Sequence, residues 1–436
     1  MKLVVLYGKA GCGKTTKMVE LIKTCKHYVV LAPTNSAVEN IYKLSGIEKR
    51  KKFKTIYSYF RIDYENNMVL GAVNMKETIF IDEFGMIDKK LFKKCYIDAK
   101  EKGCKTMIIS GDVMQLNPIY AEKQYISFNK LKKWHDVWNK LILSRVNNDS
   151  KISKLPKLNT TTQAQTAFNT PYLHPSVVEH LHLNIFGSKL IMNNRECELV
   201  PLTINHRSSG KVKDVLNNIY SGNMNWNYEF VEFYQLCELI MNNEYTFIAS
   251  KYKLLQNIYD LIYDNYLVKK LPFNDIYIFK QQMKGNLGFK VLYLYSGLKL
   301  VICKTVKDKY INGQEVIFTG SMLGSDLKCI DILTNQEIIV KKTSDEFGNL
   351  YYPVSPLYLL TVHKSQGRTI KNVIVCIDEI FDMCMLYTAI TRAKENLKFY
   401  TICNMKERVA KLMESASINE FKQLNTIAVR MKEVIN

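Results

Sequence analysis

A glycine-rich stretch near the start of the chain constrains its fold more than any other feature. Residues 8–15 read GKAGCGKT and match G-x-x-x-x-G-K-[ST] at every fixed position. They follow a continuous apolar run, LVVLY (3–7), which is typical of a strand buried on both faces of a parallel sheet. Residues 16–26 read as a helix. Strand, loop and helix thus occur in the order that a phosphate-binding loop requires.

The residue types in this loop indicate what it can bind. Glycines let backbone N–H groups turn toward a polyphosphate. Lys14 can reach the β- and γ-phosphates, and the Thr15 hydroxyl can ligate Mg²⁺. The expected nucleotide contacts are Gly8, Lys9, Ala10, Gly11, Cys12, Gly13, Lys14, Thr15 and Thr16.

A second apolar run, TIFI (78–81), ends in two carboxylates. Asp82 is the expected second ligand of Mg²⁺, because it follows the strand directly. Glu83 is the expected base that polarises the attacking water, since hydrolysis needs a base as well as a metal. ATP or another NTP, together with Mg²⁺, is therefore the expected cofactor.

The net charge indicates the kind of partner that the protein binds, and the cysteines indicate the compartment in which it works. Lys and Arg number 61 against 41 Asp and Glu, a net charge of +20, which favours a nucleic-acid partner. The chain has no apolar run of 18 residues, so no membrane association is expected. The apolar start is too short for a signal peptide. Eleven cysteines without a C-x-x-C pair indicate buried thiols in a reducing, intracellular compartment.

Apolar runs alternate with helical stretches along the chain, which predicts an α/β fold with parallel sheets. The first set has strands at 3–7, 28–32, 78–81 and 106–110, and a second set has strands at 246–249 and 373–377. Residues 291–356 contain short β-type runs separated by Gly, Asn and Asp, which is typical of a small all-β module.

A series of short motifs follows the phosphate loop in a fixed order. They read LAPTNSA (31–37), TIYS (55–58), IDEFGMI (81–87), SGDVMQLNP (110–118), LTINHRSSG (202–210), TVHKSQGRT (361–369) and YTAITRAKENL (387–397). Together they resemble the motif series of superfamily 1 helicases, and the resemblance spans nearly the whole chain. VHKSQGRT, DEFGM and YINGQEV (310–316) resemble the RecD-like and Pif-type branch, which moves 5′ to 3′.

The resemblance implies a domain organisation. Residues 1–195 would form a first RecA-like domain, with a small insertion at about 45–75 and a variable segment at 119–200. Residues 196–436 would form a second RecA-like domain, and 291–356 an SH3-like β module inserted in it.

The resemblance also implies roles by position. Lys14 and Glu83 keep the roles argued above. Gln115 would sense the γ-phosphate, and Arg207 and Arg392 would reach it from the second domain. Gly367 would contact the nucleotide and link its state to the strand. The expected nucleic-acid contacts are Thr34, Asn35, Tyr57, Phe60 and His363. For Tyr57 and Phe60, a place in the core of a small helix is the alternative.

The function implied is an ATP-dependent helicase on single-stranded DNA, acting as a monomer, with DNA replication partners left open. Two alternatives stay open: a viral superfamily 1 RNA helicase, and a packaging or movement protein that uses NTP as a switch. The glutamine motif that this family carries upstream has no counterpart before Gly8, so selectivity among NTPs is open. Abundant Lys, Asn, Ile and Tyr suit an AT-rich genome, and a viral source is one interpretation.

Overall fold

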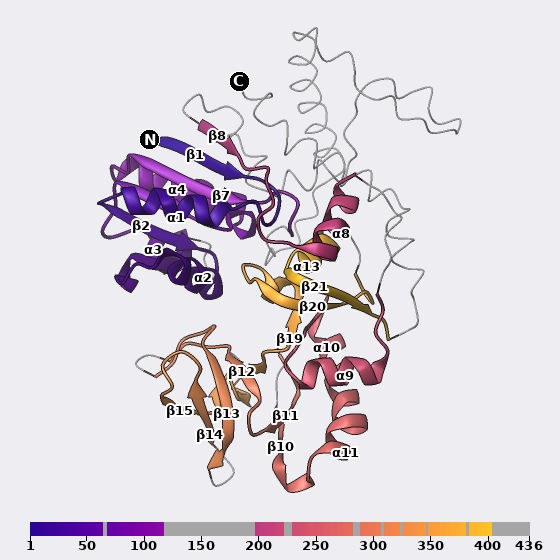
Figure 1. The fold of residues 1–436 in the computed structure, drawn as a ribbon. Coiled ribbons are helices and arrows are strands. Elements are labelled where there is room, and N and C mark those ends of the chain that lie inside the picture. Colours follow the sequence, from indigo (N-terminus) through magenta and orange to yellow (C-terminus); the bar gives the residue numbers. More distant parts are fainter. Residues whose placement is uncertain are drawn as a thin grey trace, which may run out of the picture.

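The computed structural model describes residues 1–63, 68–116, 197–221, 229–281, 288–306, 309–322, 326–345, 348–380 and 383–402 (Figure 1). The variable segment predicted at 119–200 lies outside these ranges up to residue 196. Among the described helices, none has the length and apolar character needed to cross a bilayer.

The first part of the chain builds a parallel sheet. Its strands lie in the order β3 (Phe53–Thr55), β2 (Tyr28–Ala32), β6 (Thr78–Ile81), β7 (Thr106–Gly111), β1 (Lys2–Tyr7) and β8 (Cys197–Pro201). Helices α1 (Lys14–Thr24) and α2 (Asn35–Ser45) pack on one face, and α3 (Ile56–Phe60) and α4 (Lys89–Glu101) on the other. Burial on both faces explains why the inner strands are apolar along their length.

The two edge strands of this sheet correct the predicted boundaries. β8 pairs with β1 from Leu3–Cys197 to Tyr7–Pro201, so the first domain extends past the predicted limit at 195. β3 lies within the insertion predicted at 45–75, yet it pairs with β2. Among the residues described in that segment, β4 (Ile62–Asp63) and β5 (Met68–Val69) form a separate antiparallel pair. β3 has only three residues, and β8 mixes polar with apolar residues because it is half-exposed at the sheet edge, so neither has a continuous apolar run.

A second parallel sheet follows, in the order β19 (Leu359–Thr361), β9 (Thr246–Ala249), β20 (Ile370–Cys376) and β21 (Ala393–Tyr400). Its helices are α8 (Gly210–Ser221), α9 (Phe233–Met241), α10 (Tyr252–Ile262) with its extension through α11 (Val268–Lys270), α12 (Val362–Ser365) and α13 (Met383–Ile390). One buried apolar cluster joins the two sheets, because it contains Met114 and Leu116 from the first part and Leu386 and Ile390 from α13.

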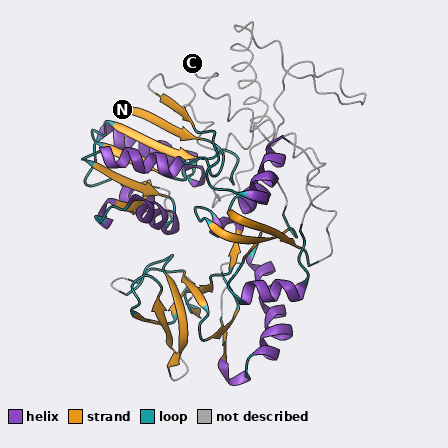
Figure 2. Cartoon of the chain, in the orientation of Figure 1, coloured by secondary structure: helices purple, strands orange, loops and turns teal. Residues whose placement is uncertain are grey.

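The predicted all-β segment forms a five-stranded antiparallel sheet (Figure 2). Its order is β15 (Glu337–Val340), β14 (Asp326–Asp331), β13 (Glu315–Met322), β12 (Lys299–Ile302) and β18 (Val354–Pro356). β16 (Thr343–Ser344) and β17 (Leu350–Tyr351) form a small pair beside it. β11 (Val291–Tyr295) pairs instead with β10 (Ile276–Lys280), so the β-rich part begins before residue 291. We call residues 299–356 the β module.

Candidate functional site

The phosphate loop connects β1 to α1, as the sequence predicts. Gly11 and Gly13 have φ angles of 80° and 74°, in the left-handed region that favours glycine. A Cβ at Gly11 would lie 2.5 Å from Oδ1 of Asn205, and the His206 N–H donates to the Gly11 carbonyl at 2.8 Å. The segment after β8 therefore packs directly against the loop, which leaves no room for a side chain there.

Lys14 opens helix α1 and turns its ammonium group back over the loop. Its Nζ donates to the carbonyl oxygens of Gly8 and Lys9 at 2.7 and 2.8 Å. The positive charge is thereby held at the loop itself, the position from which a lysine can act on phosphate oxygens.

Two oxygen-bearing side chains meet beside the loop. The Thr15 hydroxyl donates to Asp82 Oδ2 at 3.0 Å. Asp82 is buried, and its Oδ1 accepts from the Ser110 hydroxyl and from the Glu83 N–H. Mg²⁺ prefers such hard oxygen donors and keeps most other positions for water and phosphate oxygens. The donor set formed by Thr15 and Asp82 therefore fits Mg²⁺.

Glu83 occupies an unusual backbone position at the end of β6. Its φ of 51° is left-handed, which is uncommon for a residue with a side chain. Burial raises the pKa of its carboxyl, the Asp82 carboxylate raises it further, and the charges of Arg392, Lys14 and Arg207 oppose the shift. These interactions place the predicted catalytic charges around one carboxylate, and a raised pKa suits a general base.

Arg392 comes from the second sheet and is almost fully buried, with 1% of its surface exposed. Its Nε donates to the Thr388 carbonyl at 3.0 Å, and its Nη2 donates to the Thr391 hydroxyl at 3.1 Å. Burial lowers the pKa of its guanidinium to about 10, Arg207 lowers it further, and Glu83 opposes the shift. Arg392 from the second domain thus interacts electrostatically with Glu83, and its contact with the γ-phosphate stays a prediction.

Arg207 corrects the prediction that both arginines belong to the second domain. It follows β8, and its N–H donates to Oδ1 of Asn205, the same atom that packs against Gly11. Its Nη1 donates to the Thr391 carbonyl at 3.4 Å. The pairing of β8 with β1 is the physical reason, because it carries the Arg207 backbone to the phosphate loop without any movement of the second sheet.

Gln115 lies buried in the turn that follows β7. The next residue, Leu116, donates its N–H to the Thr388 hydroxyl on α13 at 3.1 Å. The turn therefore touches the second domain, and a γ-phosphate contact of Gln115 stays a prediction. Sequence analysis missed Asp112 and Tyr387, which are hydrogen-bonded to each other. Both residues lie in motifs given above, Asp112 in 110–118 and Tyr387 in 387–397, and this was the signal from which they could have been found.

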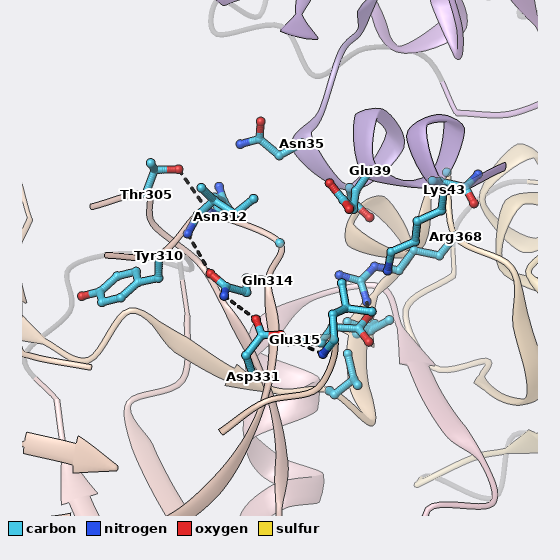
Figure 3. A pocket seen from close by; sticks show the side chains of 18 of the residues that line it. Asn35, Glu39, Lys43, Thr305, Tyr310, Asn312, Gln314, Glu315, Asp331 and Arg368 are labelled. Carbon is cyan, nitrogen blue, oxygen red and sulfur yellow. Dashed lines mark hydrogen bonds and ion pairs between the residues drawn. The ribbon is translucent and has the colours of Figure 1, made fainter. Parts of the chain in front are cut away.

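A cleft of about 910 Å³ opens where the first domain, the β module and the segment after α12 meet (Figure 3). Helix α2 supplies Asn35, Glu39 and Lys43 to its wall. Arg368 also lines the cleft and forms an ion pair with Glu315 at 3.4 Å. The cleft thus carries charges of both signs on three separate parts of the fold.

The predicted nucleic-acid contacts divide between this cleft and the core. Asn35 lines the cleft, next to Thr34, whose hydroxyl caps α2 by accepting from the Ala37 N–H. Phe60 is fully buried in the first domain, so its prediction as a strand contact is wrong. It sits there because its ring fills the core under α3. Tyr57 and His363 are half-buried, and neither belongs to the cleft wall.

Gly367 lines the cleft, and its predicted contact with the nucleotide stays a prediction. Its φ is 76°, and a Cβ there would meet the Ala37 methyl group at 3.3 Å. The close approach of this backbone to the start of α2 is what brings it to the cleft.

Two family models match the chain. An AAA domain matches residues 1–134, which contain the phosphate loop, and a UvrD-like helicase C-terminal domain matches residues 356–400, which contain Arg392. Each match falls on one of the two parallel sheets.

Two relatives resemble most of the chain. An uncharacterized protein of Methanocaldococcus jannaschii, MJ1519, is 24% identical over 90% of this chain, and the chain spans 36% of that protein. The ATP-dependent DNA helicase Pif1 of Campylobacter jejuni is 23% identical over 91% of this chain and 88% of its own.

Solved Pif1 structures share the fold. A structure of two Pif1 helicases that unwind forked double-stranded DNA covers 99% of this chain and 94% of its own, at 19% identity and a TM-score of 0.59. Pif1 from Bacteroides in complex with ADP-AlF3 and ssDNA covers 91% and 88%, at 19% identity and a TM-score of 0.56. At such identities the likeness establishes the fold.

A phosphate loop on one parallel sheet thus faces an arginine from a second, and the two features lie in the segments that match an AAA domain and a UvrD-like helicase C-terminal domain. Over most of its length, the chain is similar to Pif1 helicases in sequence and in fold.

Proposed function

We propose that this protein is an ATP-dependent DNA helicase that moves 5′ to 3′ along single-stranded DNA. One observation carries the proposal: Glu83 lies beside the Thr15–Asp82 pair and interacts with Lys14 from the loop and with Arg392 from the second domain. Charges from both domains therefore meet at the place where a γ-phosphate would react.

Each side chain has a role in hydrolysis under this proposal. Lys14 binds the β- and γ-phosphate oxygens as a point charge. Thr15 and Asp82 hold Mg²⁺, which neutralises phosphate charge when bound. Glu83 orients the attacking water and accepts its proton. Arg392 stabilises charge that develops in the transition state, because its guanidinium comes from the opposite domain.

In this proposal the cleft binds the single-stranded DNA. Asn35 on α2 and Gly367 after α12 stand on two different domains, so a strand in the cleft would contact both. Movement of one domain relative to the other would then move the strand. The net charge of +20 supports a polyanionic partner. We assign the two parallel-sheet domains as RecA-like and the β module as SH3-like, and we propose ATP as the nucleotide.

Unwinding of tailed duplexes tests this function. We expect ATP-dependent strand separation of a DNA duplex that has a 5′ single-stranded tail, and little with a 3′ tail. Separation only with 3′ tails would contradict the polarity, and separation only of RNA duplexes would favour the viral RNA helicase type. A protein that binds DNA and hydrolyses ATP without separating any duplex would be a nucleotide-switched binder.

A further inference from the structure

Tyr387 connects three parts of the fold through one hydroxyl. It lies on α13 of the second domain and is fully buried. Its hydroxyl accepts a hydrogen bond from the Ala10 N–H in the phosphate loop at 2.9 Å, and it donates to Asp112 Oδ2 at 2.8 Å. Ala10 and Asp112 both belong to the first domain, so the hydroxyl bridges the two domains at the loop.

The acceptor of this bridge is itself fixed. Asp112 is 3% exposed, and its other oxygen, Oδ1, accepts from the Met114 N–H at 3.0 Å. A buried carboxylate with a partner on each oxygen defines the position of the phenol strongly, because hydrogen bonds to a charged acceptor are short and directional. The Tyr387 ring therefore has a defined position relative to the loop.

The next residue repeats the connection. The Thr388 hydroxyl accepts from the Leu116 N–H at 3.1 Å and donates to the Cys384 carbonyl at 2.7 Å. Two consecutive residues of α13 thus bond to two separate segments of the first domain. A helix held at two adjacent residues can neither slide nor rotate without breaking one of these hydrogen bonds.

Arg392 depends on the same helix end. Its Nε donates to the carbonyl of Thr388, four residues earlier. Hydrogen bonds therefore connect the loop to the guanidinium in two steps. Ala10 bonds to the Tyr387 hydroxyl on α13, and Arg392 bonds to Thr388 on the same helix.

We propose that Tyr387 is a positioning residue for hydrolysis: its hydroxyl fixes α13 against the phosphate loop and thereby sets Arg392 at the γ-phosphate position. The inference rests on the proposed ATPase activity. In this inference Tyr387 affects turnover through Arg392, so its loss should lower turnover little once Arg392 is absent.

Tyr387→Phe is the variant that removes the hydroxyl and keeps the buried ring. We expect kcat for ATP to fall by about tenfold or more, since α13 and with it Arg392 lose the hydrogen bonds that fix them to Ala10 and Asp112. The affinity for nucleotide should stay within about threefold, because Arg392 acts mainly in the transition state. Tyr259→Phe is the matched control: that hydroxyl is equally buried but bonds to Tyr293 within the second domain.

A double-mutant cycle separates positioning from general stability. Tyr387→Phe in an Arg392→Ala background should lower kcat no further than Arg392→Ala alone. Multiplicative losses would overturn the inference, and so would a wild-type kcat in Tyr387→Phe. Should Tyr387→Phe fold poorly, Thr388→Val gives a second route, because it removes the acceptor of the Leu116 N–H and should show the same non-additivity.

Amide hydrogen exchange tests the bridge without using activity. In nucleotide-free protein, the peptide that contains Ala10 should exchange faster in Tyr387→Phe than in wild type, and Tyr259→Phe should leave it unchanged. Unchanged exchange in Tyr387→Phe would overturn the bridge whether or not the protein hydrolyses ATP. If wild-type protein hydrolysed no ATP, that result would contradict the proposed function and not the bridge.

Discussion

The Thr15 hydroxyl donates to the Asp82 carboxylate across 3.0 Å, although the two residues are 67 positions apart in the sequence. Each follows a strand of the same parallel sheet, and parallel strands present their carboxyl ends at one edge. The pair is therefore a product of the fold, and it brings a hydroxyl and a carboxylate together where a metal–nucleotide complex would bind.

Loss of the Thr15 hydroxyl should weaken Mg²⁺ binding more than it weakens the fold. We expect Thr15→Ala to raise the Mg²⁺ concentration for half-maximal ATP hydrolysis by about tenfold or more. Thr15→Ser keeps the hydroxyl and serves as the control, with a Mg²⁺ requirement near that of wild type. Equal Mg²⁺ requirements in Thr15→Ala and wild type would remove Thr15 from the metal site.

The two arginines should give different kinetic signatures. Arg392→Ala should bind nucleotide within a few-fold of wild type but hydrolyse it slower by on the order of 10³-fold. Arg392→Lys should recover little, because a point charge does not reproduce the planar guanidinium. Stopped-flow binding of a fluorescent nucleotide, beside steady-state hydrolysis, separates binding from turnover. Thermal melting must show that loss of this buried residue leaves the protein folded.

Arg207 is held at the phosphate loop by the first domain, so it is present whether or not the domains close. We expect Arg207→Ala to weaken nucleotide binding as well as turnover. A pure turnover defect in Arg207→Ala, with unchanged affinity, would instead assign it the same closure-dependent role as Arg392.

Glu83 should give hydrolysis a pH dependence above the usual carboxyl range. Burial and Asp82 raise the pKa of Glu83, and a general base must be ionised to act. The acid limb of the kcat profile should therefore lie above about 4.3, the ordinary value for Glu. A limb at or below that value in wild type would contradict Glu83 as the base.

The raised pKa of Glu83 also lowers the stability of the folded protein at neutral pH. A carboxyl whose pKa is raised in the folded state binds more protons there than in the unfolded state, so this contribution destabilises the fold as pH rises through the shifted range. Glu83→Gln removes the charge and should raise Tm at neutral pH while it lowers kcat. A lower Tm in Glu83→Gln would contradict the assigned direction.

Phe60 and Tyr57 should behave differently although they share one short helix. Phe60→Ala should destabilise the protein by about 3–5 kcal/mol, because it opens a cavity in the core of the first domain. Tyr57→Ala should destabilise it less, and we expect it to weaken single-stranded DNA binding if the half-buried ring stacks on a base. Urea melts and DNA titrations measure both effects, with Tyr57→Phe as the control that keeps the ring.

The sequence predicted the inner part of the first domain well. β2 and β6 have the predicted bounds, since central strands buried on both faces leave a continuous apolar run. The contact between Thr15 and Asp82 was also predictable, because both residues follow parallel strands whose carboxyl ends lie at one edge of the sheet. The edge strands β3 and β8 were assigned to other parts of the chain, since β3 has only three residues and β8 is largely unburied and mixes polar with apolar residues.

Contacts between segments that are far apart in the chain could not be predicted from the sequence. Tyr387 is 377 residues from Ala10 and 275 from Asp112, and no local pattern encodes which hydroxyl a loop amide will meet. Arg207 was assigned to the wrong domain for the same reason, since only the pairing of β8 with β1 shows where it belongs. Phe60 was predicted as a nucleic-acid contact from the family resemblance, yet its burial follows from packing that the resemblance does not describe.

The dependence of ATP hydrolysis on single-stranded DNA tests the central claim most directly, because it asks whether the cleft and the nucleotide site act together. Steady-state turnover should be measured as single-stranded DNA is added, with Lys14→Ala as the background, since that variant lacks the phosphate-binding charge. We expect wild-type turnover to rise steeply and to saturate, and Lys14→Ala to stay near zero throughout. Wild-type turnover that is the same with and without DNA would contradict a DNA-driven motor.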